Sequence, residues 1–286
     1  MAPSNMRTIA LLGHPVAHSI SPRFQQAALD AMGVDARYEA WDVLPADLPI
    51  AVERLRSAEL LGANVTVPHK VEIRRLVDRP DALVERVGAV NTIVRRDGQL
   101  HATNTDVAGI LRALEGAEVG LAGQRVVLIG AGGAARAVVV AMRTAGASML
   151  TVANRSRERA AALVPLGGDE LDLEVCALDE GDDRFREALS EAAVVIHSTT
   201  LGMRHGPDEG ATPVPASLFR PGQVAFDLVY VPERTPFLAA AERAGARTVG
   251  GLAMLVHQGA EAFRLWTGYE PPIDVMFAAA RAALAS

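Results

Sequence analysis

Lysine is nearly absent from this chain of 286 residues: of its 28 basic residues only Lys70 is a lysine, and the others are arginines. Cysteine is equally scarce, because Cys176 stands alone, which excludes an intrachain disulfide and any Cys/His metal-binding spacing. No segment approaches the roughly 18 apolar residues of a membrane span, and the N-terminal apolar run is too short for a signal peptide. We therefore expect a cytoplasmic protein with no metal ion and no membrane partner.

An excess of positive charge is lacking as well. The formal net charge is -6 and no block of Lys and Arg residues stands out, so the sequence argues against a nucleic-acid partner. Half of the residues are hydrophobic, which is enough for sizeable cores, and the length suggests about two domains. The sequence leaves the oligomeric state open, with a homodimer as one possibility.

The first hundred residues mix strand-like and helix-like segments. Ser21 has the character of a helix N-cap, followed by Pro22 at the first helical position. Asp97-Gly98 is a strong hairpin signal between two short strands. One hairpin among strands and helices predicts a mixed sheet. The expected strands are 7–13, 36–43, 62–68, 89–96 and 99–104, and the expected helices are 21–33 and 46–58.

From residue 124 onward, strands and helices alternate in a rhythm that is typical of a parallel sheet covered on both faces. Two long helices then end the chain, and they could pack on either domain. The fold class is therefore α/β with two domains, and we place the boundaries near 106 and 251. The expected strands are 125–130, 148–155, 174–178, 192–198, 223–230 and 247–251, and the expected helices are 131–146, 183–190, 251–267 and 272–285.

A glycine-rich turn, IGAGGAAR, lies between strand 125–130 and the helix after it. Gly130 allows a tight turn, Gly132 lets the backbone approach a pyrophosphate, and Ala135 fills the small third position of a dinucleotide-binding fingerprint. The free amides at the helix start attract phosphate. A plain strand-to-helix connection could use the same residues, but the flanking strand and helix favour a Rossmann-type nucleotide-binding domain.

The end of the next strand selects the nucleotide. An NAD enzyme usually has a carboxylate there for the ribose 2′-hydroxyl, whereas this chain has Asn154, Arg155 and Ser156, followed by Arg157 and Arg159. A guanidinium, a hydroxyl and a helix start suit an additional phosphate. Positive charge at a helix N-terminus otherwise opposes the helix dipole. NADP is therefore favoured over NAD.

Lys70 follows the strand-like segment 64–67, which Pro68 ends. Strand ends in α/β proteins are where ligand-binding groups collect. A lysine can release a proton whereas an arginine holds its charge, so the only lysine suits proton chemistry, although most lysines are solvated surface amines.

Several motifs follow one another in order: HPVAHSISP, NVTVPHK, GAVNT with NTD, IGAGGAAR, ANRS, DLVYVPERTPFL and GGLAMLVHQGAEAFRLWTG. With them the chain resembles the shikimate dehydrogenase family, the shikimate/quinate dehydrogenases, from residue 9 to about 269. The resemblance implies NADP-dependent reversible reduction of 3-dehydroshikimate to shikimate in aromatic amino-acid biosynthesis. It also implies a substrate-binding domain, 1–106 with 252–286, a Rossmann domain, 107–251, and an active cleft between them.

The resemblance also implies roles for individual residues. The catalytic lysine and aspartate of the family fall on Lys70 and Asp106, and the two serines that bind the substrate carboxylate fall on Ser19 and Ser21. The other substrate-binding positions are Thr66, Asn91, Tyr230 and Gln258. The cofactor-binding positions are Gly130, Ala131, Gly132, Gly133, Ala134, Asn154, Arg155, Ser156, Arg159, Leu228 and Gly251.

The implied chemistry suits these residue types. Reduction of a ketone needs a proton donor at the carbonyl oxygen, and an ammonium beside a carboxylate stays protonated near neutral pH, so Lys70 could donate while Asp106 orients it. Simpler roles are open for some residues. Ser21 could only cap its helix, Asn91 could be a turn residue, and Asp106 could cap the helix that follows it.

Histidines mark two departures from the family pattern: His69 precedes the lysine in place of an aromatic or aliphatic residue, and His197 replaces an expected asparagine. These changes could tune substrate choice, including toward quinate, and they leave the reaction class intact. His14, His18 and His69 lack metal-ligand spacing, and we expect them to form a polar lining.

Two other functions stay open. A quinate or aminoshikimate dehydrogenase is less well supported, because a differently oriented acid usually needs an anchor other than Ser19 and Ser21. A non-catalytic nucleotide-sensing module would need neither Lys70 nor Asp106. Oxidation assays with shikimate and quinate, each with both cofactors, separate these functions.

Overall fold

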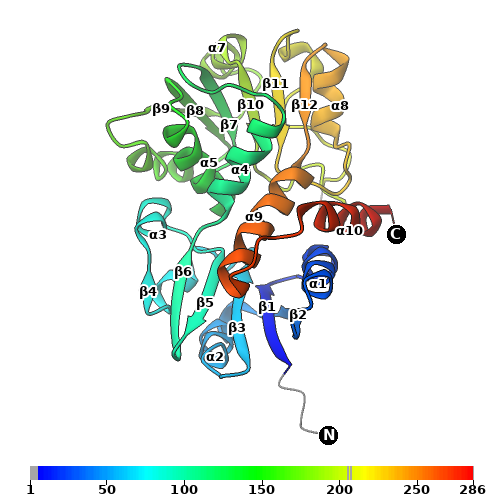
Figure 1. Ribbon diagram of the computed structural model, residues 1–286. Helices are drawn as coiled ribbons and strands as arrows, with labels where there is room; N and C mark the ends of the chain where they lie inside the picture. Colours follow the sequence, from blue (N-terminus) through cyan, green and yellow to red (C-terminus); the bar gives the residue numbers. More distant parts are fainter. Residues whose placement is uncertain (1–5, 205, 207, 286) are drawn as a thin grey trace, which may run out of the picture. The chain divides into compact units, whose positions relative to one another are not determined.

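The chain folds into two compact units, each with its own sheet (Figure 1). The computed structural model describes residues 6–204, 206 and 208–285. The described part of the first unit lies within residues 1–109 and 256–286, and the second unit lies within 110–255. The α/β fold with a mixed sheet and a Rossmann-type sheet, predicted from the sequence, is confirmed.

The first unit contains a mixed sheet with the strand order β2-β1-β3-β5-β6-β4. β1 is parallel to β2 and β3, and β5 is antiparallel to β3 and β6. Asp97 and Gly98 join β5 to β6 with φ angles of 51° and 78°, as a two-residue hairpin turn requires. The strands are β1 (Arg7–Gly13), β2 (Ala36–Asp42), β3 (Leu60–Val65), β4 (Arg79–Pro80), β5 (Thr92–Arg96) and β6 (Gln99–Thr103).

Helices cover both faces of this mixed sheet. Leu48 and Val52 of α2 pack with Ala10 and Ala63 on one face. On the other face, α9 lies against β3 and β5. The helices of this unit are α1 (Ser21–Ala31), α2 (Leu48–Arg54), α3 (Ala82–Val87), α10 (Ile273–Ala285) and most of α9 (Gly251–Thr267), with 3-10 turns at Pro45–Asp47 and Glu72–Arg75.

Gly62 allows α9 to approach β3 closely. The indole Nε1 of Trp266 donates to the carbonyl oxygen of Ile93 at 2.8 Å. Gly62 has a φ angle of 153°, and a Cβ atom there would lie 2.0 Å from the Ile93 oxygen and 2.8 Å from the indole nitrogen. Only glycine therefore fits at this position.

β2 forms one edge of the mixed sheet, and α1 covers part of that edge. The side chain of Gln26 donates to the carbonyl oxygen of Ala36 at 3.3 Å and accepts from the backbone N–H of Tyr38 at 2.8 Å. Two backbone groups that no neighbouring strand can pair are thereby satisfied.

The start of α1 differs from the sequence prediction. Ile20 already has helical backbone angles and occupies the N-cap position, which no side chain caps, so Ser21 lies inside the helix. The hydroxyl of Ser19 instead accepts the backbone N–H of Ser21 at 3.2 Å. The predicted capping role of Ser21 is therefore wrong, because the first turn begins one residue earlier.

The second unit contains a fully parallel sheet with the strand order β12-β11-β10-β7-β8-β9. The order reverses between β7 and β10, and ligands of such sheets bind at the carboxyl ends of the strands beside this reversal. The strands are β7 (Arg125–Ile129), β8 (Met149–Asn154), β9 (Asp172–Ala177), β10 (Val194–His197), β11 (Val224–Asp227) and β12 (Arg247–Val249).

Helices cover both faces of this parallel sheet too. Phe185 of α7 and Phe237 of α8 pack with Val127 of β7 on one face. The neighbouring residues of β7 point to the opposite face, where α5 packs. The helices are α4 (Asp106–Gly116), which begins in the first unit, α5 (Gly133–Thr144), α6 (Arg157–Ala161), α7 (Asp183–Glu191) and α8 (Pro236–Arg243), with 3-10 turns at Val164–Gly167 and Ala216–Leu218.

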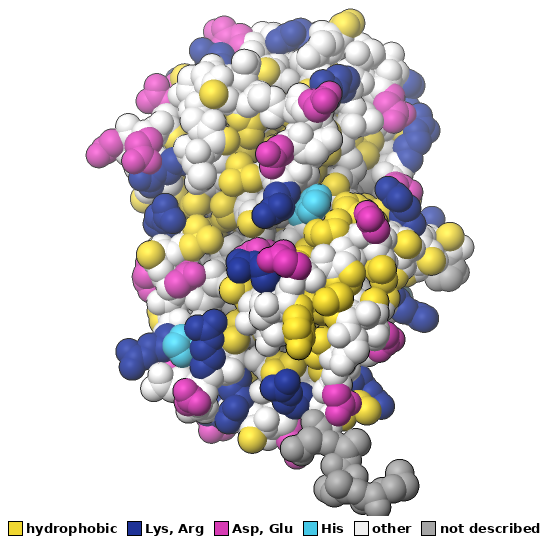
Figure 2. Space-filling model, in the orientation of Figure 1, with side chains coloured by type: hydrophobic (Ala, Val, Ile, Leu, Met, Phe, Trp, Pro, Cys, Tyr) yellow, Lys and Arg dark blue, Asp and Glu magenta, His cyan; other side chains and the backbone are white. Residues whose placement is uncertain are grey.

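The surface carries charges of both signs. Figure 2 shows basic and acidic side chains interspersed over the face that it draws. Within the described residues, no helix combines the length and hydropathy that a bilayer crossing needs. The same residues contain no group of His, Cys, Asp and Glu side chains that could hold a metal ion.

Candidate active site

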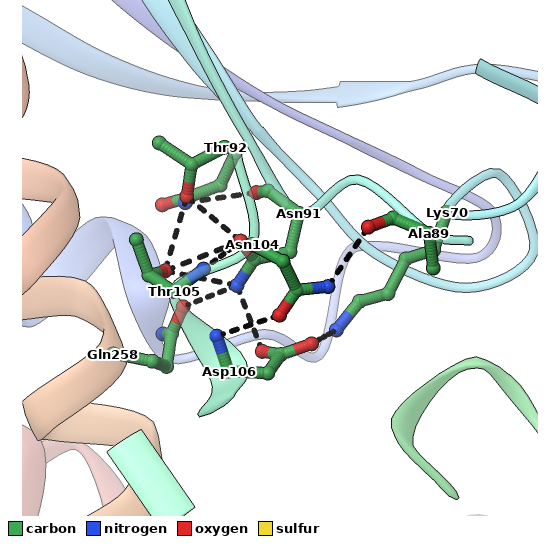
Figure 3. Close-up of polar contacts among 9 residues, drawn as sticks. Lys70, Ala89, Asn91, Thr92, Asn104, Thr105, Asp106 and Gln258 are labelled. Carbon is green, nitrogen blue, oxygen red and sulfur yellow. Dashed lines mark hydrogen bonds and ion pairs between the residues drawn. The ribbon is translucent and has the colours of Figure 1, made fainter. Parts of the chain in front are cut away.

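Lys70 and Asp106 form an ion pair in the first unit (Figure 3). Lys70 Nζ lies 2.6 Å from Asp106 Oδ2, and the two side chains are 15% and 3% exposed. The turn after β3 positions Lys70, since the backbone N–H of His69 bonds to the carbonyl oxygen of Thr66 at 2.9 Å. Asp106 is the first residue of α4, where the helix dipole stabilises a negative charge.

Asn91 binds the carboxylate oxygen that does not face Lys70. Its Nδ2 atom donates to Asp106 Oδ1 at 2.8 Å and lies 3.2 Å from Gln258 Oε1. Its Oδ1 atom accepts the backbone N–H of Thr105 at 2.7 Å, which fixes the orientation of the amide group. The carboxylate of Asp106 is therefore held at both oxygens.

Asn104 and the segment 89–91 hold the backbone on which this pair depends. The side chain of Asn104 accepts the backbone N–H of Asp106 at 3.1 Å and donates to the carbonyl oxygen of Ala89 at 3.0 Å. The backbone N–H of Val90 donates to the carbonyl oxygen of Lys70 at 2.7 Å. Asn104, and not Asp106, thus supplies the side chain that satisfies the start of α4. The capping role that the sequence left open for Asp106 is not observed.

A buried chain of polar side chains continues from Asn91 toward the edge of the sheet. Asn64 donates to the carbonyl oxygen of Asn91 at 3.1 Å and to the hydroxyl of Thr92 at 3.2 Å. The hydroxyl of Tyr38 donates to Asn64 Oδ1 at 2.8 Å. Burial raises the pKa of Tyr38, so this hydroxyl keeps its proton. Every member has a partner, which makes the network rigid.

The segments that carry Ser19, Ser21 and Thr66 adjoin one another. The backbone N–H of His14 donates to the carbonyl oxygen of Val67 at 3.0 Å, so the loop after β1 runs beside the loop after β3. One turn after Ser21, Gln25 donates to the carbonyl oxygen of Gly259 at 2.9 Å. This bond ties the start of α1 to the part of α9 that contains Gln258.

The glycine turn after β7 leaves room for a phosphate group. Gly130 has a φ angle of 108°, and a Cβ atom there would lie 2.7 Å from the hydroxyl oxygen of Ser198. A Cβ atom on Gly132 would meet nothing within 4 Å, so the space above this residue is open. No side chain caps the start of α5, which leaves its first backbone N–H groups available to an anion. The turn therefore fits a pyrophosphate.

The end of β8 presents cations without carboxylate partners. Arg155, Arg157 and Arg159 are exposed, and within residues 6–204, 206 and 208–285 none of them forms an ion pair. Ser156 accepts the backbone N–H of Arg159 at 3.2 Å and so caps α6. Asn154 donates to the carbonyl oxygen of Ser156 at 2.8 Å. This segment fits a second phosphate group at a helix start.

Leu228 and Gly251 lie together in the second unit. A Cβ atom on Gly251 would lie 2.6 Å from the carbonyl oxygen of Leu228, so a residue without a side chain is required at the start of α9. Tyr230 follows two residues after Leu228 in the loop after β11, and it is half-buried.

Family models match most of the chain. The shikimate dehydrogenase substrate binding domain matches residues 11–93, shikimate / quinate 5-dehydrogenase matches 113–203, and the shikimate 5′-dehydrogenase C-terminal domain matches 251–281. The shikimate dehydrogenase (NADP(+)) of Moorella thermoacetica is 49% identical over 269 residues, which cover 94% of this chain and 90% of the relative. The chain belongs to the shikimate dehydrogenase family.

Solved structures of the shikimate dehydrogenase family have the same fold. Shikimate 5-dehydrogenase from Thermus thermophilus, in complex with NADP(H) and shikimate, is 40% identical with a TM-score of 0.87 and covers 98% of this chain and 100% of that chain. Quinate dehydrogenase from Corynebacterium glutamicum, in complex with NAD, is 30% identical with a TM-score of 0.86 and covers 96% and 98%. The family prediction is confirmed.

His69 does not form the polar lining that the sequence suggested. Its side chain is only 2% exposed, and Nε2 bonds to the carbonyl oxygen of Val43 at 2.7 Å. The ring thereby connects the turn that contains Lys70 to the end of β2. His14 bonds instead to Asp42, with 2.8 Å between Nδ1 and Oδ1.

Sequence reasoning missed the polar residues behind the ion pair. Asn64 and Thr92 lie on buried strands and Asn104 lies at a strand end, all without a predicted role in the site. Their signal in the sequence was a polar residue among apolar ones in a strand, since such a residue needs a buried partner.

Proposed function

We propose that this chain catalyses the NADP-dependent, reversible reduction of 3-dehydroshikimate to shikimate in aromatic amino-acid biosynthesis. The observation that carries the proposal is the Lys70–Asp106 pair at 2.6 Å, held in place by Asn91. Family membership supports the substrate class and the cofactor. Lys70 and Asp106 are the catalytic residues in this proposal.

Lys70 is the proton donor. NADPH supplies the hydride when bound. As the substrate ketone becomes an alcohol, its oxygen gains negative charge and takes a proton from Lys70 Nζ. Asp106 keeps the amine aimed and bonds to it before and after the transfer. Because the Lys70 side chain is 15% exposed, the amine can regain its proton from solvent.

Ser19 and Ser21 bind the substrate carboxylate. The Ser19 hydroxyl oxygen already accepts the backbone N–H of Ser21, so its own hydrogen is available to a carboxylate. The start of α1 adds a favourable dipole. A carboxylate bound there is remote from the reacting carbon, so these residues orient the ring.

Thr66, Asn91, Gln258 and Tyr230 bind the ring hydroxyl groups. Asn91 Nδ2 has two hydrogens but lies near three acceptors, the hydroxyl of Thr105, Asp106 Oδ1 and Gln258 Oε1. The contact with Gln258 is the longest at 3.2 Å. A substrate hydroxyl that replaces this contact binds both amides and leaves the bond to Asp106 intact.

NADP binds to the second unit in this proposal. The glycine turn holds the pyrophosphate, and the end of β8 holds the 2′-phosphate. Leu228 and Gly251 contact the rest of the cofactor. The cofactor-binding residues are Gly130, Ala131, Gly132, Gly133, Ala134, Asn154, Arg155, Ser156, Arg159, Leu228 and Gly251. Residues 1–106 with 252–286 then form the substrate-binding domain, and 107–251 form the NADP-binding domain.

The proposal includes a cytoplasmic location, a homodimer and no nucleic-acid or membrane partner. Light scattering during size-exclusion chromatography measures the oligomeric state, and fractionation of cells measures the location. A monomer at micromolar concentration contradicts the homodimer without affecting the proposed reaction.

The test is an oxidation assay with purified protein, in which the absorbance of the reduced cofactor is followed with shikimate or quinate and with NADP+ or NAD+. We expect the highest kcat/KM with shikimate and NADP+. A higher kcat/KM with quinate indicates a quinate dehydrogenase, which the similarity to the Corynebacterium enzyme makes the second candidate. Cofactor binding without any turnover indicates a nucleotide sensor.

A further inference from the structure

His197 and Asp227 form a buried pair at the ends of two neighbouring strands. His197 ends β10 and Asp227 ends β11, and both side chains are 0% exposed. His197 Nδ1 lies 2.9 Å from Asp227 Oδ1, and Nε2 lies 2.5 Å from the hydroxyl oxygen of Thr199. The imidazole ring thus links Asp227, at the end of β11, to Thr199, in the loop after β10.

Asp227 fixes the direction of the bond to His197. Its carboxylate also accepts the backbone N–H of Val229 at 2.9 Å and the hydroxyl of Thr235 at 2.6 Å. A carboxylate oxygen that is bonded in this way accepts, so Nδ1 of His197 donates. Thr235 in turn caps α8. Asp227 is therefore a fixed anchor for the ring.

Thr199 lies directly behind the glycine turn. A Cβ atom on Gly130 would meet the Thr199 methyl carbon at 2.8 Å, and the backbone N–H of Ser198 donates to the carbonyl oxygen of Ile129 at 2.9 Å. The hydroxyl of Thr199 also accepts the backbone N–H of Leu201 at 3.1 Å. The position of Thr199 therefore determines how the loop after β10 supports the turn.

This loop lies on the side of the sheet away from the end of β8. In a sheet of this order a dinucleotide crosses the carboxyl ends of the strands at the reversal between β7 and β10. If the 2′-phosphate lies at Arg155, after β8, the other half of the cofactor lies over β10 and β11. The pair of His197 and Asp227 lies beneath that half.

An asparagine at 197 reproduces only one of the two histidine bonds. Its Nδ2 occupies the position of the imidazole Nδ1 and can donate to Asp227, but the side chain has no atom in the place of Nε2. The bond to Thr199 is therefore the bond that histidine adds in this chain.

We propose that His197 is a positioning residue for the nicotinamide half of the cofactor. His197 acts by holding Thr199 and the loop after β10 against the glycine turn. The inference rests on the proposed binding of NADP. Loss of the bond between His197 and Thr199 weakens binding of the whole dinucleotide more than binding of its adenosine 2′-phosphate end.

The experiment compares two ligands by calorimetric titration of the full chain, NADP+ and its fragment 2′,5′-ADP. His197→Asn keeps the bond to Asp227, so the strand ends stay paired. We expect its Kd for NADP+ to rise roughly threefold to tenfold, the range for one lost hydrogen bond. The rise for 2′,5′-ADP should be smaller, because this fragment keeps only the 5′-phosphate at the glycine turn and lacks the nicotinamide half. Thr199→Val should give the same pattern, whereas Thr199→Ser keeps the hydroxyl and should bind both ligands as the unmodified chain does.

The double variant His197→Asn with Thr199→Val shows whether the two residues act on NADP+ binding through one shared bond or independently. If the two residues act through one bond, the double variant should bind NADP+ no more weakly than the weaker single variant. An unchanged Kd for NADP+ in His197→Asn overturns the inference, and an equal loss for both ligands shows general damage to the domain and overturns it too. Failure of the unmodified chain to bind NADP+ contradicts the proposed function itself.

Discussion

The side-chain amide of Asn91 donates to Asp106 at 2.8 Å, through the carboxylate oxygen that does not face the lysine. The carboxylate therefore cannot rotate without losing a bond at one oxygen or the other. Its orientation determines where the amine of Lys70 points, since this amine lies 2.6 Å from the second oxygen. A proton donor must be held within a narrow range of positions and orientations relative to the substrate oxygen. The bonds to Asp106 hold the amine of Lys70 in this way.

Modification of Lys70 should abolish turnover while NADP+ binding stays nearly intact. An amine-directed reagent can react only with Lys70 and the N-terminus, because the chain has no other lysine. Peptide mapping counts the two sites separately, and bound shikimate should protect Lys70. Lys70→Arg keeps the charge but loses the compact proton donor, and its kcat should fall by about 10²–10⁴. An arginine variant with most of its activity would make Lys70 a binding cation only.

Asp106→Asn should impair the same step as the Lys70 variant. The ammonium of Lys70 then donates to an uncharged amide oxygen, and the amine loses the negative charge that aims it. Single-turnover kinetics should show that the variant with both Lys70→Arg and Asp106→Asn is little slower than the slower single variant, because groups that act as a unit are not additive. Multiplied losses in the double variant would show that the residues act independently.

Arg155→Asp should weaken NADP+ binding much more than NAD+ binding. A charge-assisted contact with the 2′-phosphate is worth roughly 1.5–3 kcal/mol, about tenfold to a hundredfold in Kd. Arg157→Asp is the matched control, since it makes the same charge change two residues away. Arg157 lines a hollow together with Val175 and Asp182, which Arg155 does not line. Titrations with both nucleotides measure the effect. Similar losses in the two variants would indicate general electrostatics, without a specific contact.

Ser19→Ala and Ser21→Ala should raise the KM for shikimate more than they lower kcat. A carboxylate that is remote from the reacting carbon is bound alike in the ground state and the transition state. Steady-state kinetics and thermal unfolding are measured together. A lower melting temperature with unchanged kinetic constants would show that the serines only stabilise the start of α1.

Cys176 should be unreactive in the folded chain. Its side chain is 3% exposed, and burial raises the pKa of its thiol to about 11, so hardly any thiolate exists near neutral pH. A colorimetric thiol reagent should react slowly with the native protein and at once after denaturation. Rapid reaction under native conditions would mean that β9 opens locally.

Long periodic segments made most of the fold predictable from the sequence. The central strands β7, β10 and β11 are largely apolar runs between turn signals. Asp97-Gly98 identified the hairpin by its chemistry alone. β4 and α3 were missed because two and six residues are too few for a period to appear, and the helix α8 was missed as well. The predicted cap at Ser21 failed because the backbone at Ile20 decided where the helix begins.

The candidate site was predictable only where a motif contained it. Lys70 stood out by its rarity and its place after a strand, and Asp106 by the family motif. The contacts that hold them were not predictable, because they join distant residues. Asn91 and Gln258 are 167 positions apart in the chain, and no local pattern connects them. Asn64 likewise acquires its role from Tyr38, which lies on another strand.

The position of Gln26 affects how two molecules of this protein can associate through β2. An unprotected edge strand invites a strand from a second molecule, which is a common route to aggregation. The side chain of Gln26 already occupies the N–H of Tyr38 and the carbonyl of Ala36, the two groups that an incoming strand would bind. A sheet that continued from one copy to the next through this part of β2 would first have to displace Gln26. The side chain of Gln26 thus opposes fibre-like association, and Gln26 is not one of the proposed catalytic residues.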